Sequence, residues 1–209
     1  MKSFAKFLVG LILVIAVLAI LGRIFIFEVA QTNSYSMIPN LVAGDYFLVN
    51  TVSLPGQGDI VVCENPEDTS SLVVLRIVGL PGDEVQLWRN HLKVNGRVIQ
   101  HNVVDPISYE DKTSDEILAY DAKVAIEKLG GQVFEVALMD RGLSKKKMDP
   151  VTIPDDHFYL VGDNRNMARD SRNFGAVPID SCIGVASFIV WPADDSGTLF
   201  FSDRIFSWL

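Results

Sequence analysis

The chain has 209 residues, 49% of them hydrophobic, which is enough for one medium-sized domain with a buried core, alone or with an apolar anchor. Its formal charge of −8 argues against nucleic acid as a partner, because binding to phosphates needs a basic surface. The sequence contains no low-complexity segment and no repeat of the length found in solenoids.

The first 28 residues are dominated by an apolar run. Residues 7–22 carry no charge, and Lys6 and Arg23 flank them. The run is slightly shorter than the ~20 residues of a spanning helix, but flanking Lys and Arg side chains can reach the headgroups. We therefore predict a transmembrane anchor with a short cytoplasmic tip at 1–28 and an exported domain at 29–209, because Lys2 and Lys6 favour a cytoplasmic N-terminus.

The alternative for this segment is a cleaved signal peptide, which should end in a small-x-small site. Glu28-Val29-Ala30 is a poor site, because Glu28 occupies the outer small position. The sequence therefore favours an uncleaved anchor.

Beyond residue 30, short runs of Val, Ile, Leu and Phe are bounded by Gly, Pro, Asn and Asp, a pattern typical of a mainly β domain. The predicted strands cover Tyr46–Val52, Asp59–Cys63, Ser71–Val78, Glu84–Leu87, His91–Val94, Arg97–Ile99, Val133–Ala137, Phe158–Val161 and Ile183–Val190. The Asn95-Gly96 pair is a strong signal for a two-residue hairpin turn.

The segment 105–149 is polar, and we interpret it as an insertion between β elements. Within it, Asp121–Leu129 followed by Gly130-Gly131 predicts a short helix with a glycine end.

Cys63 and Cys182 both lie in apolar runs of β type. An even number of cysteines in an exported domain permits a disulfide, and two buried free thiols fit the sequence equally well.

The last ten residues are unusually apolar, which suggests packing on the body or contact with a bilayer, and packing is the commoner outcome. The large apolar residues are Phe200, Phe201, Ile205, Phe206, Trp208 and Leu209.

Four sequence blocks follow the apolar N-terminus in a fixed order. They are Ser34–Pro39 with Gly44-Asp45, then Gly58–Val62, then Arg76–Asp83, and finally Gly162–Arg165 continuing through Asp170–Arg172 to Gly175. Together they resemble the type I signal peptidases, the membrane-anchored leader peptidases.

This resemblance implies an antiparallel β domain of two sheets on the outer face of the bacterial cytoplasmic membrane. It also implies a serine endopeptidase that removes signal peptides from exported preproteins, with signal peptides, preproteins and membrane lipid as partners and no cofactor or metal. By resemblance Ser36 is the nucleophile, and Ser34 helps to bind the oxyanion with the backbone amide of Ser36. Such enzymes use a lysine base, which burial keeps neutral.

Two departures from the family pattern fall where the mechanism needs specific residues, and Tyr35 and Asn40 are lesser departures. Where the third block normally begins with the base lysine, this chain has Leu75 before Arg76. Where the fourth block normally has a serine that orients the lysine, this chain has Ala168. Leucine cannot accept a proton, and alanine has no polar group that could orient a lysine.

No other residue in these blocks replaces the base. Arg76 is adjacent, but a guanidinium is effectively always protonated. His91, His101, His157 and Lys93 lie outside the matching motifs, where structural or solvated roles are expected.

The remaining charged motif residues are expected to form ion pairs that shape the floor of the cleft. They are Arg76, Asp163, Arg165, Asp170 and Arg172.

Two functions follow, and whether the chain is an active enzyme stays open. One is a signal peptidase that is catalytically impaired because it lacks the lysine base. The other is a non-catalytic homologue that binds signal peptides or membrane-proximal peptides as an assembly factor or chaperone. A purely structural β protein is the least favoured reading.

Overall fold

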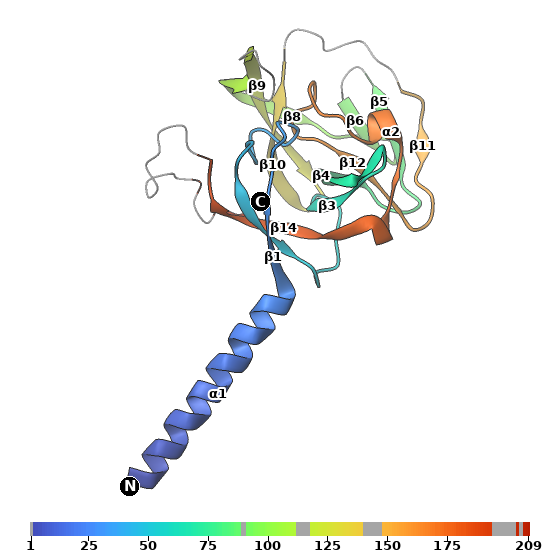
Figure 1. The fold of residues 1–209 in the computed structure, drawn as a ribbon. Coiled ribbons are helices and arrows are strands. Elements are labelled where there is room, and N and C mark those ends of the chain that lie inside the picture. Colours follow the sequence, from blue (N-terminus) through green and yellow to red (C-terminus); the bar gives the residue numbers. More distant parts are fainter. Residues whose placement is uncertain (1, 89–90, 112–117, 140–147, 194–203, 205–206) are drawn as a thin grey trace.

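The computed structural model describes residues 2–88, 91–111, 118–139, 148–193, 204 and 207–209. Helix α1 (Lys2–Ile26) extends away from a β body (Figure 1). The strands of the body are β1 (Phe27–Gln31), β2 (Tyr46–Asn50), β3 (Ile60–Asn65), β4 (Asp68–Gly79), β5 (Glu84–Trp88), β6 (His91–Val94), β7 (Arg97–Val98), β8 (His101–Asp111), β9 (Leu118–Leu129), β10 (Gln132–Leu138), β11 (Val151–Thr152), β12 (His157–Val161), β13 (Val177–Pro178) and β14 (Cys182–Trp191). Along the chain, the short helix α2 (Ser171–Phe174) precedes β13 and the short helix η1 (Ile179–Ser181) follows it.

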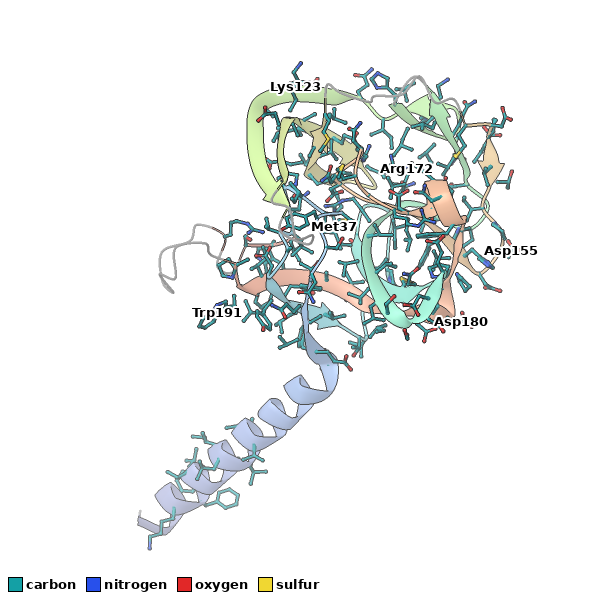
Figure 2. The ribbon with its side chains drawn as sticks, turned by 45° about the horizontal axis from the view of Figure 1, so that its top comes forward. Met37, Lys123, Asp155, Arg172, Asp180 and Trp191 are labelled. Atoms are coloured by element: carbon teal, nitrogen blue, oxygen red, sulfur yellow. A yellow bond between two sulfur atoms is a disulfide. The ribbon has the colours of Figure 1, made fainter. Side chains whose placement is uncertain are left out.

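The apolar N-terminal run forms α1, a continuous segment without proline that can complete its backbone hydrogen bonds locally. Its described side chains from Phe4 to Val17 are exposed, and Figure 2 shows side chains projecting from a helix that extends away from the body. Among the described residues, no helix combines the length and the apolar character that crossing a membrane requires. The transmembrane anchor at 1–28 therefore stays a prediction.

The largest sheet has the strand order β1-β2-β14-β3-β4-β12-β13. Strand β3 begins with a continuous apolar run that is buried on both faces, and β4 is buried on both faces over its last five residues, which include Arg76. Phe47, Val61, Leu75 and Leu160 are almost fully buried in its core. This core fixes β4, which brings residues 75 and 76 to the site described below.

Strands β3 and β14 are antiparallel neighbours with Cys63 opposite Cys182. The two sulfur atoms form a disulfide between positions 119 residues apart. Of the two alternatives that the sequence left open, the structure has the cross-link.

Two smaller sheets complete the body, with strand orders β10-β9-β8 and β11-β5-β6-β7. The described residues thus form three antiparallel sheets, and the expectation of two is wrong because the insertion builds a sheet of its own. Every predicted strand is present. The Asn95-Gly96 turn joins β6 to β7 with φ angles of 50° and 74°, as a tight hairpin requires.

The helix predicted at Asp121–Leu129 is wrong, because this segment lies in β9. Exposed Asp121 and Lys123 alternate with buried Ala122 and Val124, which is the period of a strand with one buried face. Gly130-Gly131, with φ angles of 60° and 86°, is a hairpin turn into β10 and not a helix end.

The insertion also packs tightly on the motif region. The amide of Ala137 donates to the carbonyl of Asp163 at 2.9 Å, and the amide of Arg165 donates back to the carbonyl of Ala137 at 3.0 Å. The insertion is therefore part of the body and supports the fourth motif block.

At the C-terminus, residues 207–209 lie along β14, and the amide of Leu209 donates to the carbonyl of Ser187 at 3.0 Å. Leu209 packs against the main core, whereas Trp208 is 82% exposed. The predicted packing of the tail holds for Leu209. The other four apolar tail residues lie outside the described residues: Phe200, Phe201, Ile205 and Phe206.

Candidate active site

A groove of about 450 Å³ opens between the end of β1 and strand β4. Residues 30–34 form one wall and residues 71–75 of β4 form the other. Ser34, Ser36 and Leu75 all line this groove. Three of the positions predicted to carry catalysis therefore share one concave surface.

The two serines contact each other directly. The Ser34 hydroxyl donates to the Ser36 Oγ at 2.8 Å, and the Ser36 amide donates to the Ser34 Oγ at 3.1 Å. The Ser36 carbonyl accepts from the amide of Asn164 at 2.9 Å, which ties this turn to the fourth motif block. The two groups expected to bind the oxyanion thus lie side by side at Ser36, the predicted nucleophile.

Leu75 and Ala168, at the positions expected to hold the base and its orienting group, meet at Gly162. A Cβ atom placed on Gly162 would lie 2.3 Å from the Ala168 Cβ, 2.6 Å from the Ser36 carbonyl oxygen and 3.5 Å from a Leu75 methyl carbon. Only glycine allows this close approach. The fold therefore brings Leu75, Ala168 and Ser36 together, and the side chains of Leu75 and Ala168 contribute only carbon atoms there.

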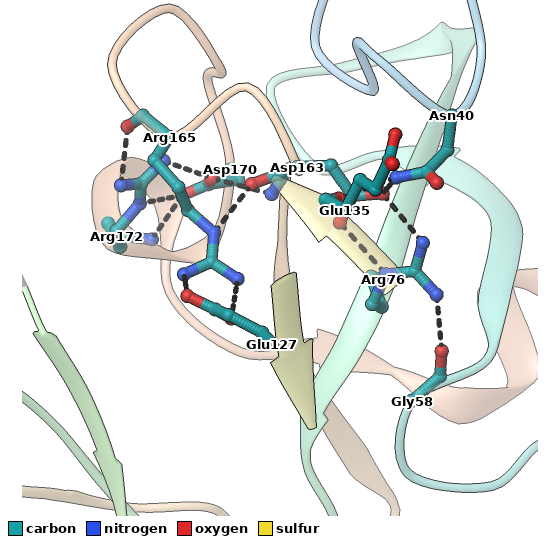
Figure 3. A network of polar contacts seen from close by, with 10 residues as sticks. Asn40, Gly58, Arg76, Glu127, Glu135, Asp163, Arg165, Asp170 and Arg172 are labelled. Atoms are coloured by element: carbon teal, nitrogen blue, oxygen red, sulfur yellow. Dashed lines mark hydrogen bonds and ion pairs between the residues drawn. The ribbon is translucent and has the colours of Figure 1, made fainter. Parts of the chain in front are cut away.

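Behind the groove, Arg76 is buried against Asp163 (Figure 3). Its Nε and Nη2 donate to the two carboxylate oxygens at 2.8 and 2.6 Å, and Nη1 donates to the carbonyl of Gly58 at 2.7 Å. The guanidinium also lies 3.9 Å from the centre of the Phe134 ring, a cation–π contact. Asn40 completes the cluster, donating at 2.7 Å to an Asp163 oxygen.

A second part of the network holds the loop that carries Ala168. Arg165 forms a bidentate ion pair with buried Glu127 at 2.8 and 2.5 Å. Arg172 pairs with Asp170 at 2.8 and 2.6 Å, and the same carboxylate accepts from the amide of Gly162 at 2.9 Å. Figure 3 shows both pairs beside the Arg76–Asp163 cluster. All five charged residues expected to pair therefore do so.

Asp170 also organises α2. It is the N-cap residue, and a reciprocal bond from its amide to the Asn173 side chain completes a capping box. The Ser171 hydroxyl accepts from the amide of Leu160 at 2.9 Å, which anchors α2 to β12. These contacts hold the polar residues of the fourth block in place around Gly162.

Sequence reasoning missed Glu127, Phe134 and Arg169. The first two come from the insertion, where no motif identified them, and Glu127 was assigned to a helix. Arg169 follows Ala168, lines the groove and pairs with Glu67. The hydrogen bond from Arg169 lowers the pKa of Glu67, and the same contact raises the pKa of Arg169.

The alternative bases whose side chains the structure describes do not line the groove. His91 and Lys93 lie on β6 and His157 begins β12, and none of them is among the described residues that line it. His101 begins β8, and its side chain lies outside the described part of the chain. Among the described residues, no group of three His, Cys, Asp or Glu side chains is placed to hold a metal ion.

Comparison with known proteins places this geometry in context. The family model for signal peptidase, peptidase S26, matches residues 4–191. A probable signal peptidase I-2 of Synechocystis sp. is 30% identical over 202 residues, covering 91% of this chain and 75% of that protein. Signal peptidase I P of Bacillus subtilis subsp. natto is 32% identical over 186 residues, covering 87% and 86%. A crystal structure of a signal peptidase I from Enterococcus faecalis V583 aligns with 25% identity and a TM-score of 0.39, over 64% of this chain and 97% of that one.

Proposed function

Since the chain belongs to the signal peptidase family, peptidase S26, we propose that it binds the signal peptides of exported preproteins in the groove at Ser36 and is impaired in cleaving them. Ser36 occupies the nucleophile position and Ser34 the oxyanion position. One observation carries the impairment: Leu75 and Ala168 meet at Gly162 beside Ser36, and neither side chain can accept a proton.

A serine hydroxyl is a weak nucleophile unless a nearby base takes its proton. Ser36 accepts a hydrogen bond from Ser34, and a hydroxyl is not a base of useful strength at neutral pH. Arg76 follows position 75 in the chain, but it is held by Asp163 and Gly58 and is permanently charged. Because the base and its orienting group act as one unit, losing both slows the reaction about as much as losing the base.

The direct test restores both groups with Leu75→Lys and Ala168→Ser in the full chain in detergent micelles. A buried lysine at position 75 would have a lowered pKa and could serve as base. We expect preprotein cleavage to rise by about 10²–10⁴-fold, the usual contribution of a positioned general base. Adding Ser36→Ala to the restored variant should abolish the gain. Cleavage by the unaltered chain at the rate of the restored variant would refute the impairment.

The second candidate is a non-catalytic homologue that binds signal peptides or membrane-proximal peptides as an assembly factor or chaperone. The intact groove and its buried ion pairs favour this function, since both persist without a base. It predicts that Ser36→Ala keeps the affinity for a labelled signal peptide within about twofold, because a small hydroxyl adds little to binding. Loss of binding in that variant would count against this function.

For location, we propose that residues 1–28 anchor the chain in the bacterial cytoplasmic membrane, with the N-terminus in the cytoplasm and residues 29–209 outside. The apolar sequence and the lysines at positions 2 and 6 support this orientation. The Cys63–Cys182 disulfide fits an oxidising compartment. Release of the chain from membranes by alkaline carbonate, or protection of its C-terminus from external protease in spheroplasts, would contradict this.

A further inference from the structure

Arg169 is the one charged side chain among the described residues that line the groove. The described walls otherwise present aliphatic side chains, hydroxyls and amides from residues 30–34, 36, 62 and 71–75. With leucine at position 75, Arg169 is the cation that a peptide in this groove meets. The groove therefore carries a positive charge, although the chain as a whole has a net charge of −8.

Glu67, in the turn between β3 and β4, pairs with Arg169 but does not line the groove. Arg169 donates to its carboxylate through Nε and through Nη2, the second bond at 2.5 Å. The Arg169 side chain remains 67% exposed and that of Glu67 38% exposed. The pair therefore presents its positive end to the groove and holds the guanidinium in one orientation.

We propose that Arg169 determines the charge preference of the groove, which favours peptides carrying an acidic side chain near the segment bound at Ser36. This inference rests on the proposed function, because it concerns which signal peptides or membrane-proximal peptides the groove accepts. No described hydrogen bond uses Nη1 of Arg169, and that group can donate to a peptide carboxylate while Nε and Nη2 stay on Glu67.

The test measures affinities by fluorescence anisotropy with the full chain in detergent micelles. Three fluorescein-labelled peptides share one alanine-rich cleavage segment of a signal peptide and carry Glu, Gln or Lys at one flanking position, which is moved along the peptide in a scan. At the best position and low salt, we expect the Glu peptide to bind about fivefold tighter than the Gln peptide, and the Lys peptide about fivefold weaker, for one exposed charge contact. At 0.5 M salt the two affinity ratios, Glu to Gln peptide and Gln to Lys peptide, should both fall towards one.

The decisive variant exchanges the two charges, Glu67→Arg with Arg169→Glu, which keeps an ion pair at the same place. We expect its preference to reverse, so that the Lys peptide binds tightest. The neutral pair Glu67→Gln with Arg169→Gln should lose the preference. The matched control is Arg97→Gln, which removes an exposed cation on β7 away from the groove and should leave the preference intact.

The outcomes distinguish a failure of this inference from a failure of the proposed function on which it rests. If all three peptides bind equally to the wild type at every position, or if the exchanged variant keeps the wild-type preference, this inference is wrong and the proposed function stands. If none of the peptides binds at all, the proposed function fails and this inference falls with it. Equal melting temperatures of wild type and exchanged variant ensure that a reversed preference reflects charge and not a changed fold.

Discussion

Replacing Asp163 with asparagine removes the charge that compensates Arg76 while keeping the shape of the side chain. The two side chains are 0% and 3% exposed, so water cannot replace the lost partner. Asp163 accepts two hydrogen bonds from Arg76 and one from Asn40. An asparagine amide would set an N–H donor against one of these donors, so the substitution both leaves a cation unpaired and creates a donor–donor contact.

Breaking a buried ion pair by removing one partner destabilises a protein by about 3–5 kcal/mol. For a chain of this size, 1 kcal/mol shifts the melting temperature by about 2–4 °C, so the expected drop is roughly 6–20 °C. The Phe134 ring and the Gly58 carbonyl still contact Arg76 and soften the loss without neutralising the charge. The expected value is therefore nearer the lower end.

Thermal unfolding of the full chain in detergent, followed by tryptophan fluorescence, measures this drop. The matched control is Asp155→Asn, which removes one negative charge from an exposed position. The control should stay close to wild type. If the Asp163→Asn variant has the same melting temperature as the control, the Arg76–Asp163 pair does not stabilise the fold as its burial indicates.

Two further predictions test the supports of the site. Replacing Cys63 and Cys182 with serine removes a cross-link between positions 119 residues apart and should lower the free energy of unfolding in urea by about 2–5 kcal/mol; an unchanged midpoint would contradict this. Gly162→Ala puts a methyl group 2.6 Å from the Ser36 carbonyl oxygen and should lower both the melting temperature and the affinity for a signal peptide. Gly56→Ala, where the nearest atom is 3.6 Å away, is the control that should change neither, and equal behaviour of the two variants would refute the close packing at Gly162.

Local patterns in the sequence predicted the strands well, because alternation and turn residues act between near neighbours. Asn95-Gly96 is the clearest case, since both residues adopt the positive φ angles that this pair favours. The same local reasoning failed at Gly130-Gly131, which ends helices and turns hairpins equally well. There the pairing of β9 with β10 decided the outcome.

The candidate site divides in the same way. Motif order predicts Ser36 as the nucleophile and Leu75 and Ala168 as departures from the family pattern, because those predictions depend only on residue types in register. Glu127 could not be assigned to Arg165 from sequence, because the pair is 38 residues apart and forms only when the insertion folds against the fourth block.

The sequence by itself determined which residue types occupy the positions predicted to react, and with them a leucine, which cannot accept a proton, at position 75. Only the tertiary structure decided that Leu75, Ala168 and Ser36 converge on Gly162, that Cys63 bonds Cys182, and that Arg169 faces the groove. The physical reason is that residue identity is carried along the chain, whereas contact between distant residues depends on how the sheets pack.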